Sequence, residues 1–334
     1  MRFFAKYLLQ RLLQFLLVVF IGINLTYVIT HATPIDPVEQ SIAAVTSFGN
    51  TSPEAIGMMR QSLRELYGLS GGRFEQYVNF WRRIGVADFG PSLSAFPTPV
   101  STLIARALPW TIGLLATATL LTWSLGNLLG GLAGYYQSKK SLKFLAVVVM
   151  GLHPVPYYIV AFVLLVMFGY LWPLLPIAGG YGINIEQGFN ATFVLSILKH
   201  SILPALSLIL VGLGGWFLGM RSLVSNVVSE DYVLYAELAG VNRRRILSSY
   251  VMRNALLPQV TGLALSLGAI FNGAIITEQV FGYPGVGSLL ISAVYAGDYS
   301  LVLGVTTISI IGVSAAVLII DLVYPLLDPR VRTA

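Results

Sequence analysis

Six long runs without Asp, Glu, Lys or Arg are the feature that most limits how this chain can fold. The runs are Leu12–Ile35, Ala107–Ser138, Phe144–Ile185, His200–Met220, Asn254–Thr277 and Tyr299–Ile320. Each is long enough for the ~20 residues that an α-helix needs to cross a bilayer core. The 334 residues are 56% hydrophobic and only 10% charged, whereas a soluble domain carries about 25% charged residues. The sequence therefore predicts an all-α integral membrane protein.

The third run, Phe144–Ile185, has 42 residues and holds either one helix or two. Lys and Arg concentrate on the cytoplasmic side of membrane proteins. Only the one-helix interpretation places the basic segments around Arg2, Lys139 and Arg243 on the same side. A Pro- and Gly-rich exit follows at Trp172–Gly182. We therefore predict six transmembrane helices with cytoplasmic N- and C-termini, the first of them retained because its 24 charge-free residues exceed the 7–15 typical of a signal peptide.

The segment from Asp36 to Arg106 separates the first two runs and carries six basic and six acidic residues. Two stretches in it are amphipathic, Pro53–Tyr67 and Arg73–Ile84. Pro at a first helical position and Gly68 past the end mark the first stretch as a helix. A small extracytoplasmic cap is the simpler interpretation, because so short a segment builds little core. A ligand-binding domain is the alternative.

Several kinds of chemistry lack their sequence signature. There is no cysteine, hence no thiolate site, and there is no P-loop or HExxH motif. His31, His153 and His200 are far apart in the sequence. We therefore expect no catalytic residue, no metal and no cofactor in this chain. The basic charge is explained by topology, so no nucleic acid is expected as a partner.

The predicted spans also contain almost no ionisable groups, with only Glu278 and Asp321 near their ends. Carriers driven by ions usually place carboxylates at membrane depth. Energy for active transport would therefore arrive through another subunit, which requires a docking surface. The longest polar interruption of the second half, Arg221–Pro258, is the candidate. Within it a helical segment, Asp231–Ala239, ends at Gly240, the residue that best supplies a left-handed helix cap.

This interruption resembles the cytoplasmic loop of the permeases of binding-protein-dependent ABC importers. In that family the loop reads Glu-Ala-Ala, three residues and Gly, and here Leu234, Tyr235, Ala236 and Gly240 occupy those positions. Pro258 follows Gly240 by 18 residues, a spacing similar to the dipeptide, oligopeptide and nickel branch. Because Leu234 replaces the Glu, no contact of that Glu is carried over.

The resemblance extends over the whole chain. It includes ATPIDP after the first run, LRELYGLSGGRFEQYVNFWRRIGVADFGPSL in the insertion, EQVFGYPGVGSLLISAVYAGDYSLVLG before the last run, and LVYPLLDPRVR at the end. Several motifs in the right order are more specific than one short match. The implied fold is the transmembrane domain of a type I ABC importer. Its implied parts are an N-terminal helix (1–35), a periplasmic insertion (36–106), a permease core (107–327) with a coupling loop (221–253), and a cytoplasmic tail (328–334).

The resemblance implies a subunit of the bacterial inner membrane that moves a small peptide by alternating access. The implied partners are a second, homologous permease, two ATP-binding subunits that carry the ATP and Mg²⁺, and a periplasmic substrate-binding protein. Residues expected to dock the ATPase are Asp231, Tyr235, Ala236, Ala239, Gly240, Arg243, Arg244 and Arg245. The arginines are equally explained as markers of the cytoplasmic side. The substrate-binding residues are not assigned.

Other functions stay open at this point. Close relatives of the branch handle nickel, glutathione or oligosaccharides with the same architecture. A stand-alone secondary carrier is the alternative from another class, and a membrane-embedded enzyme lacks any nucleophile–base pair.

Overall fold

The computed structural model describes the chain except for residues 1, 33–36, 47–51, 189 and 328–334, so the predicted cytoplasmic tail lies outside the described residues. The regular structure described is helical, and one antiparallel bridge joins Pro91 to Pro99. Contacts divide the chain into two units, Met1–Trp110 with Gly285–Ser314 and Thr111–Pro284 with Ala315–Ala334.

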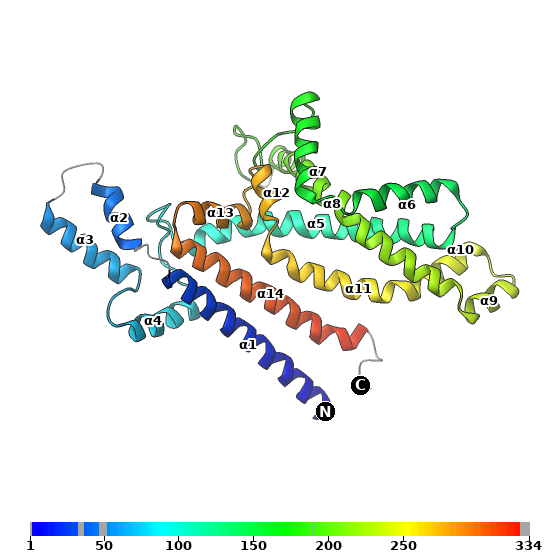
Figure 1. The fold of residues 1–334 in the computed structure, drawn as a ribbon, viewed down its shortest axis with the longest axis horizontal. Helices are drawn as coiled ribbons and strands as arrows, with labels where there is room; N and C mark the ends of the chain where they lie inside the picture. The colour runs from blue at the N-terminus through cyan, green and yellow to red at the C-terminus, as the bar shows by residue number, and fades with distance from the viewer. Residues whose placement is uncertain (1, 33–36, 47–51, 189, 328–334) are drawn as a thin grey trace. The chain divides into compact units, whose positions relative to one another are not determined.

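Figure 1 shows the helices in chain order. They are α1 (Arg2–Ala32), α2 (Pro37–Thr46), α3 (Pro53–Leu66), α4 (Arg73–Gly85), α5 (Val100–Tyr135), α6 (Lys140–Leu152), α7 (Tyr157–Leu165), α8 (Ala191–Val228), α9 (Asp231–Leu238), α10 (Arg243–Arg245), α11 (Arg253–Gly268), α12 (Ile275–Val280), α13 (Val286–Tyr295) and α14 (Tyr299–Leu327). Two π-helical segments, η1 (Val166–Leu171) and η2 (Ile246–Met252), and a 3₁₀ turn, η3 (Ala269–Asn272), continue neighbouring helices.

Five helical stretches are long and apolar enough to cross a membrane, in agreement with five of the predicted runs. They are Tyr7–His31, Val100–Tyr135, Ala191–Val228, Arg243–Phe271 and Tyr299–Val323. The fourth stretch ends earlier than predicted, because Gly273 adopts a φ of +72° and breaks the helix before α12. Thr277 and Glu278 therefore lie in α12 and not at the end of a span, and both are buried.

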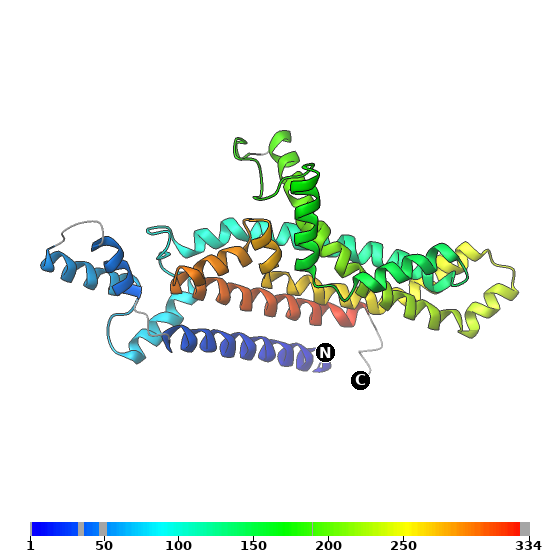
Figure 2. The same ribbon diagram turned by 45° about the horizontal axis from the view of Figure 1, so that its top comes forward.

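The third predicted run is not one continuous helix. It forms α6 and the pair α7–η1, which meet at an angle of 100° and diverge clearly in Figure 2. Pro154 and Pro156 stand at the bend, and proline cannot donate the backbone hydrogen bond that a continuing helix needs. Counted as one broken span, the pair completes the six predicted crossings.

Within the second unit, α8 crosses the part of α5 that follows Trp110 with almost no space between the two backbones. Gly126, Gly130 and Gly134 form a stripe of three glycines, four residues apart, on the face of α5 that meets α8. A Cβ on Gly130 would collide with the carbonyl oxygen of Phe217, and one on Gly134 would lie 2.8 Å from that of Arg221. Small residues permit such close packing between membrane helices. The glycine stripe therefore brings the two backbones into direct contact.

The insertion in the first unit contains both predicted helices. The predicted stretches correspond to α3 and α4 within one residue, and Ser52 caps α3 by accepting a hydrogen bond from the Ala55 amide at 3.3 Å. Helix α2 was not predicted, and it packs on α3 through Val38, Ile42 and Leu63. The first unit thus holds a small cap in which α2 and α3 share a core of their own.

Candidate functional site

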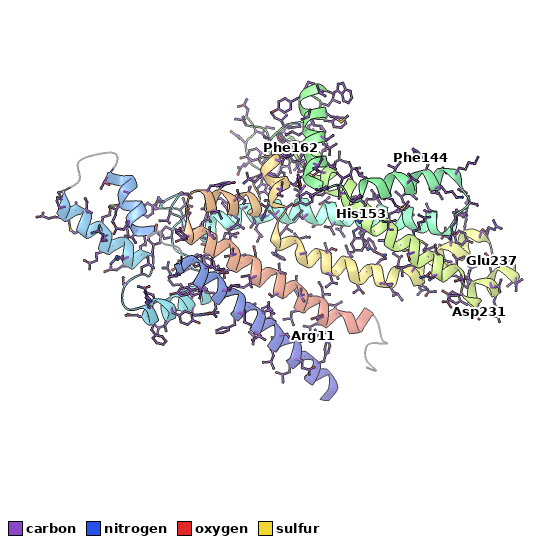
Figure 3. All side chains as sticks on the ribbon, viewed as in Figure 1. Arg11, Phe144, His153, Phe162, Asp231 and Glu237 are labelled. Carbon is purple, nitrogen blue, oxygen red and sulfur yellow. The ribbon has the colours of Figure 1, made fainter. Side chains whose placement is uncertain are left out.

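The predicted docking residues all lie in the segment that follows α8. Helix α9 begins three residues after α8 ends, and α10 and η2 then lead directly into α11. Figure 3 labels Asp231 and Glu237 near the two ends of α9. Contacts join α9 to both α8 and η2, so the segment folds back on the helices that it connects.

Two side chains on one face of α9 anchor it. Val233 and Ala236 are only 1% and 6% exposed, and three residues apart they share a helix face. Both belong to a buried cluster that also contains Met220, Val224, Ile246, Val251 and Ala255. The predicted docking residue Ala236 is therefore covered by the protein's own core. Its small side chain permits α9 to approach α8 and η2.

The opposite face of α9 presents apolar side chains to the outside. Leu234, Tyr235 and Leu238, which we call the α9 patch, are exposed, Tyr235 and Leu238 at 67% and 75%. Leu238 follows Leu234 by four residues and Tyr235 by three, so the three side chains adjoin. A cluster of exposed large apolar groups on a short helix is typical of a surface that a partner covers.

Gly240 ends α9 in the predicted way. Its φ is +73°, a conformation that costs residues with a Cβ about 1 kcal/mol or more. Its amide donates to the Glu237 carbonyl at 3.0 Å, and the Val241 amide donates to the Ala236 carbonyl at 3.1 Å. This pair of bonds is a Schellman cap. It turns the chain sharply after the patch and returns Val241 to the buried cluster.

Charged groups frame the α9 patch. Asp231 lies in the first turn of α9, where a negative charge is favoured by the helix dipole. Beyond the cap, Asn242 accepts a hydrogen bond from the Arg244 amide at 2.9 Å, and the side chains of Arg243, Arg244 and Arg245 are exposed. The structure thus brings Asp231, Tyr235, Ala239, Gly240 and the arginines together on one exposed segment.

Sequence reasoning missed part of the site. Leu234 and Leu238 belong to the exposed face, and a polar bond ties its base to the next span, because the Asn254 side chain donates to the Tyr232 hydroxyl at 2.9 Å. The spacing of Leu234, Tyr235 and Leu238 was a usable signal. The sequence did not indicate which face of α9 is buried, since Val233 and Ala236 are no more apolar than the exposed Leu234 and Leu238.

The described residues contain no group of three or more His, Cys, Asp and Glu side chains close enough to hold a metal ion. His31, His153 and His200 lie on α1, after α6 and on α8 respectively. His153 packs against α8, where Gly214 makes room for its ring. This contact places it at the bend between α6 and α7 (Figure 3).

Comparisons with known proteins agree with this architecture. Residues 126–333 match the family described as "Binding-protein-dependent transport system inner membrane component". Three similar relatives align over 98% of this chain and 99% of their own length. They are the oligopeptide transport system permease protein AppB of Bacillus subtilis (28% identical), the dipeptide transport system permease protein DppB of Lactococcus lactis (25%) and the oligopeptide transport system permease protein OppB of Haemophilus influenzae (29%).

The family match covers more than half of the chain, including the whole α9 segment. Such a component is a transport subunit and not an enzyme, and it works with a substrate-binding protein and with ATPase subunits. The chain therefore belongs to the family of inner membrane components of binding-protein-dependent transport systems.

Proposed function

We propose that the chain is one of two permease subunits through which a binding-protein-dependent ABC importer moves short peptides, and that the α9 patch seats it in the ATPase. The docking role rests on one observation: α9 exposes the three apolar side chains of the α9 patch while Val233 and Ala236 on its other face are buried. The peptide substrate is supported by the names of the relatives, which describe oligopeptide and dipeptide transport.

The patch suits a groove in a partner. Amphipathic helices bind grooves through apolar anchors three or four residues apart, and on α9 Leu238 follows Tyr235 by three residues and Leu234 by four. Arg243, Arg244 and Arg245 add positive charge beside the patch, which favours a groove with an acidic rim. ATP and Mg²⁺ would be held by the ATPase and not by this chain.

Force applied to α9 reaches the spans through rigid contacts. Val233 and Ala236 connect α9 to α8 and η2, and the glycine stripe locks α8 to α5. When two ATPase subunits close on ATP, a displacement of α9 would therefore move α8 and α5 together instead of bending the segment. In the proposed cycle this motion turns the pathway between this chain and a second, homologous permease from inward- to outward-facing.

The docking role is tested by removing the α9 patch. A Tyr235→Ala, Leu238→Ala double variant should insert normally but lose co-purified ATPase and about tenfold or more of substrate-stimulated ATP hydrolysis, since truncating interface anchors typically costs 2 kcal/mol or more. Phe144→Ala on α6 is the matched control, because Phe144 is equally exposed at 73% but lies outside the patch. Undiminished coupling in the double variant would exclude the patch as the docking surface.

The substrate class is tested on the cognate binding protein, purified without added ligand. Mass spectrometry of the small molecules that it retains should identify short peptides. A retained nickel complex, glutathione or oligosaccharide would overturn the peptide assignment and leave the docking role intact. A homomer of this chain that transports without any ATPase would overturn both.

A further inference from the structure

The first unit contains a cavity that the proposed transport cycle does not use. It has a volume of about 920 Å³ and is lined by the end of α1, by α3, α4 and the loop between them, and by the first residues of α14. Binding sites for small molecules usually measure about 300–1,000 Å³. The cavity is therefore large enough for a solute of a few residues.

Aromatic rings form one part of the lining. Tyr27 on α1 and Phe80 on α4 pack together with ring centres 4.6 Å apart, and both line the cavity. His31 stacks on Tyr27, with ring centres 3.9 Å apart, and its Nδ1 is 3.0 Å from the Tyr27 carbonyl oxygen. Because a carbonyl oxygen only accepts, Nδ1 carries the proton in this contact. Nε2 is then the ring atom that accepts from a ligand N–H when the ring is neutral.

Helix α3 supplies charges of both signs to the same cavity. Arg60 and Arg64 lie one turn apart, and both line it together with Glu65. Arg60 binds the Glu39 carboxylate through two hydrogen bonds of 2.7 and 3.0 Å. These bonds lower the pKa of Glu39, and the charge of Arg64 contributes to the same shift. Arg60 thus pairs with Glu39 and Arg64 adds positive charge nearby, while Glu65 supplies a second carboxylate that accepts from Gln61 at 3.4 Å.

We infer that this cavity is a binding site for short zwitterionic peptides. Arg64 would bind the C-terminal carboxylate, because a guanidinium group matches the planar carboxylate geometry. Glu65 and His31 Nε2 provide acceptors for the ammonium and amide groups, and the rings of Tyr27 and Phe80 cover apolar side chains. Such a peptide matches the donors, the acceptors and the apolar rings of this lining at once, whereas a purely anionic or purely apolar solute matches only part of it. The inference rests on the proposed peptide import and adds a permease site to it.

The experiment uses the full chain in lipid nanodiscs, without binding protein or ATPase. The probe is trialanine, followed by saturation-transfer NMR, and trialanine amide serves as the probe that lacks the carboxylate. Arg64→Met should weaken trialanine binding about tenfold, as expected for a lost charge-assisted hydrogen bond. The amide should bind the unmodified chain about tenfold more weakly than trialanine, and Arg64→Met should not weaken the amide further.

Arg73→Met is the matched control, because Arg73 is an exposed arginine of the same insertion that does not line the cavity. Phe80→Leu provides a second variant that keeps all charges and should also weaken the probe. Absence of saturation transfer to trialanine, or equal binding by the Arg64 and Arg73 variants, would overturn the inference. None of these results alters ATPase coupling through the α9 patch, so the two proposals fail separately.

Discussion

The α9 segment (α9, α10 and η2) and the insertion (36–106) both connect spans outside the apolar runs, but their packing differs. The α9 segment contributes to a described cluster of seven buried side chains, on top of a helix crossing with no room for a Cβ. The insertion packs three buried side chains between α2 and α3. It also lines, together with α1 and α14, a cavity of about 920 Å³, and it carries the ion pairs Arg60–Glu39 and Arg83–Asp88.

The difference indicates two mechanical roles. A densely packed segment transmits displacement, because close-packed interiors hardly compress. A cap with little core and a large cavity opens locally at low cost. The α9 segment is thus suited to carry force, and the insertion is suited to admit a ligand.

The largest effect is expected at the crossing of α5 and α8. Gly130→Leu should abolish transport and sharply reduce the fraction of protein that folds, because the leucine side chain would have to displace the backbone of Phe217. Overpacking of a tight core typically costs about 1–3 kcal/mol or more. Gly113→Leu on the same helix is the control, since nothing lies within 4 Å of a Cβ there. Fluorescence-detected size exclusion measures the folded fraction. Similar behaviour of both variants would contradict a rigid crossing.

A matched pair of truncations compares the two cores. Ile246→Ala and Leu63→Ala each remove a buried aliphatic side chain, at a typical cost of 2–5 kcal/mol. Ile246→Ala should accelerate hydrogen exchange in α8, α9 and η2 and reduce ATPase coupling. Leu63→Ala should accelerate exchange in α2 and α3 alone. Loss of ATPase coupling in the Leu63 variant would show that the cap is not mechanically separate.

Two glycine-to-alanine substitutions should change local stability in opposite directions. Gly240→Ala should destabilise the α9 segment by about 1 kcal/mol, because its φ is +73° and no atom lies within 4 Å of a Cβ, so the cost is conformational. Gly57→Ala in α3 should stabilise the cap by about 0.5–1 kcal/mol, since alanine favours a helix interior. Hydrogen exchange of α9 and α3 measures both. A stabilising Gly240→Ala would contradict the Schellman cap.

The smallest effect concerns Asp88 in the insertion. Burial alone would raise its pKa, but hydrogen bonds from Arg83 and from the Gly90 amide outweigh burial and lower it. A lowered pKa in the folded state gives stability that is complete above the ordinary carboxyl pKa and is lost as the pH falls through the lowered value. Asp88→Asn should therefore cost about 0.5 kcal/mol at pH 7, a value typical of an exposed pair. The difference from the unmodified chain should shrink as the pH falls through the lowered pKa of Asp88, as measured by hydrogen exchange in α4.

Much of this protein was predictable from its sequence. The charge-free runs located five of the spans, because an ionised side chain in hydrocarbon is too costly to occur by chance. Gly240 determined where α9 ends, since few residues other than glycine adopt a positive φ without cost. Pro53 and Gly68 delimited α3 for the same local reasons. Each of these features depends on one residue and its immediate environment.

Only the tertiary structure decided which residues of α9 face outward. Ala236 is buried and Leu238 exposed, against their apolar character, because Met220, Val224 and Ile246 cover one face of the helix and leave the other uncovered. The cavity lined by Arg64 and the close backbone contact between Gly130 and Phe217 are likewise formed by segments far apart in the chain. Such features depend on shape complementarity between distant segments, which local propensity and hydrophobic pattern do not encode.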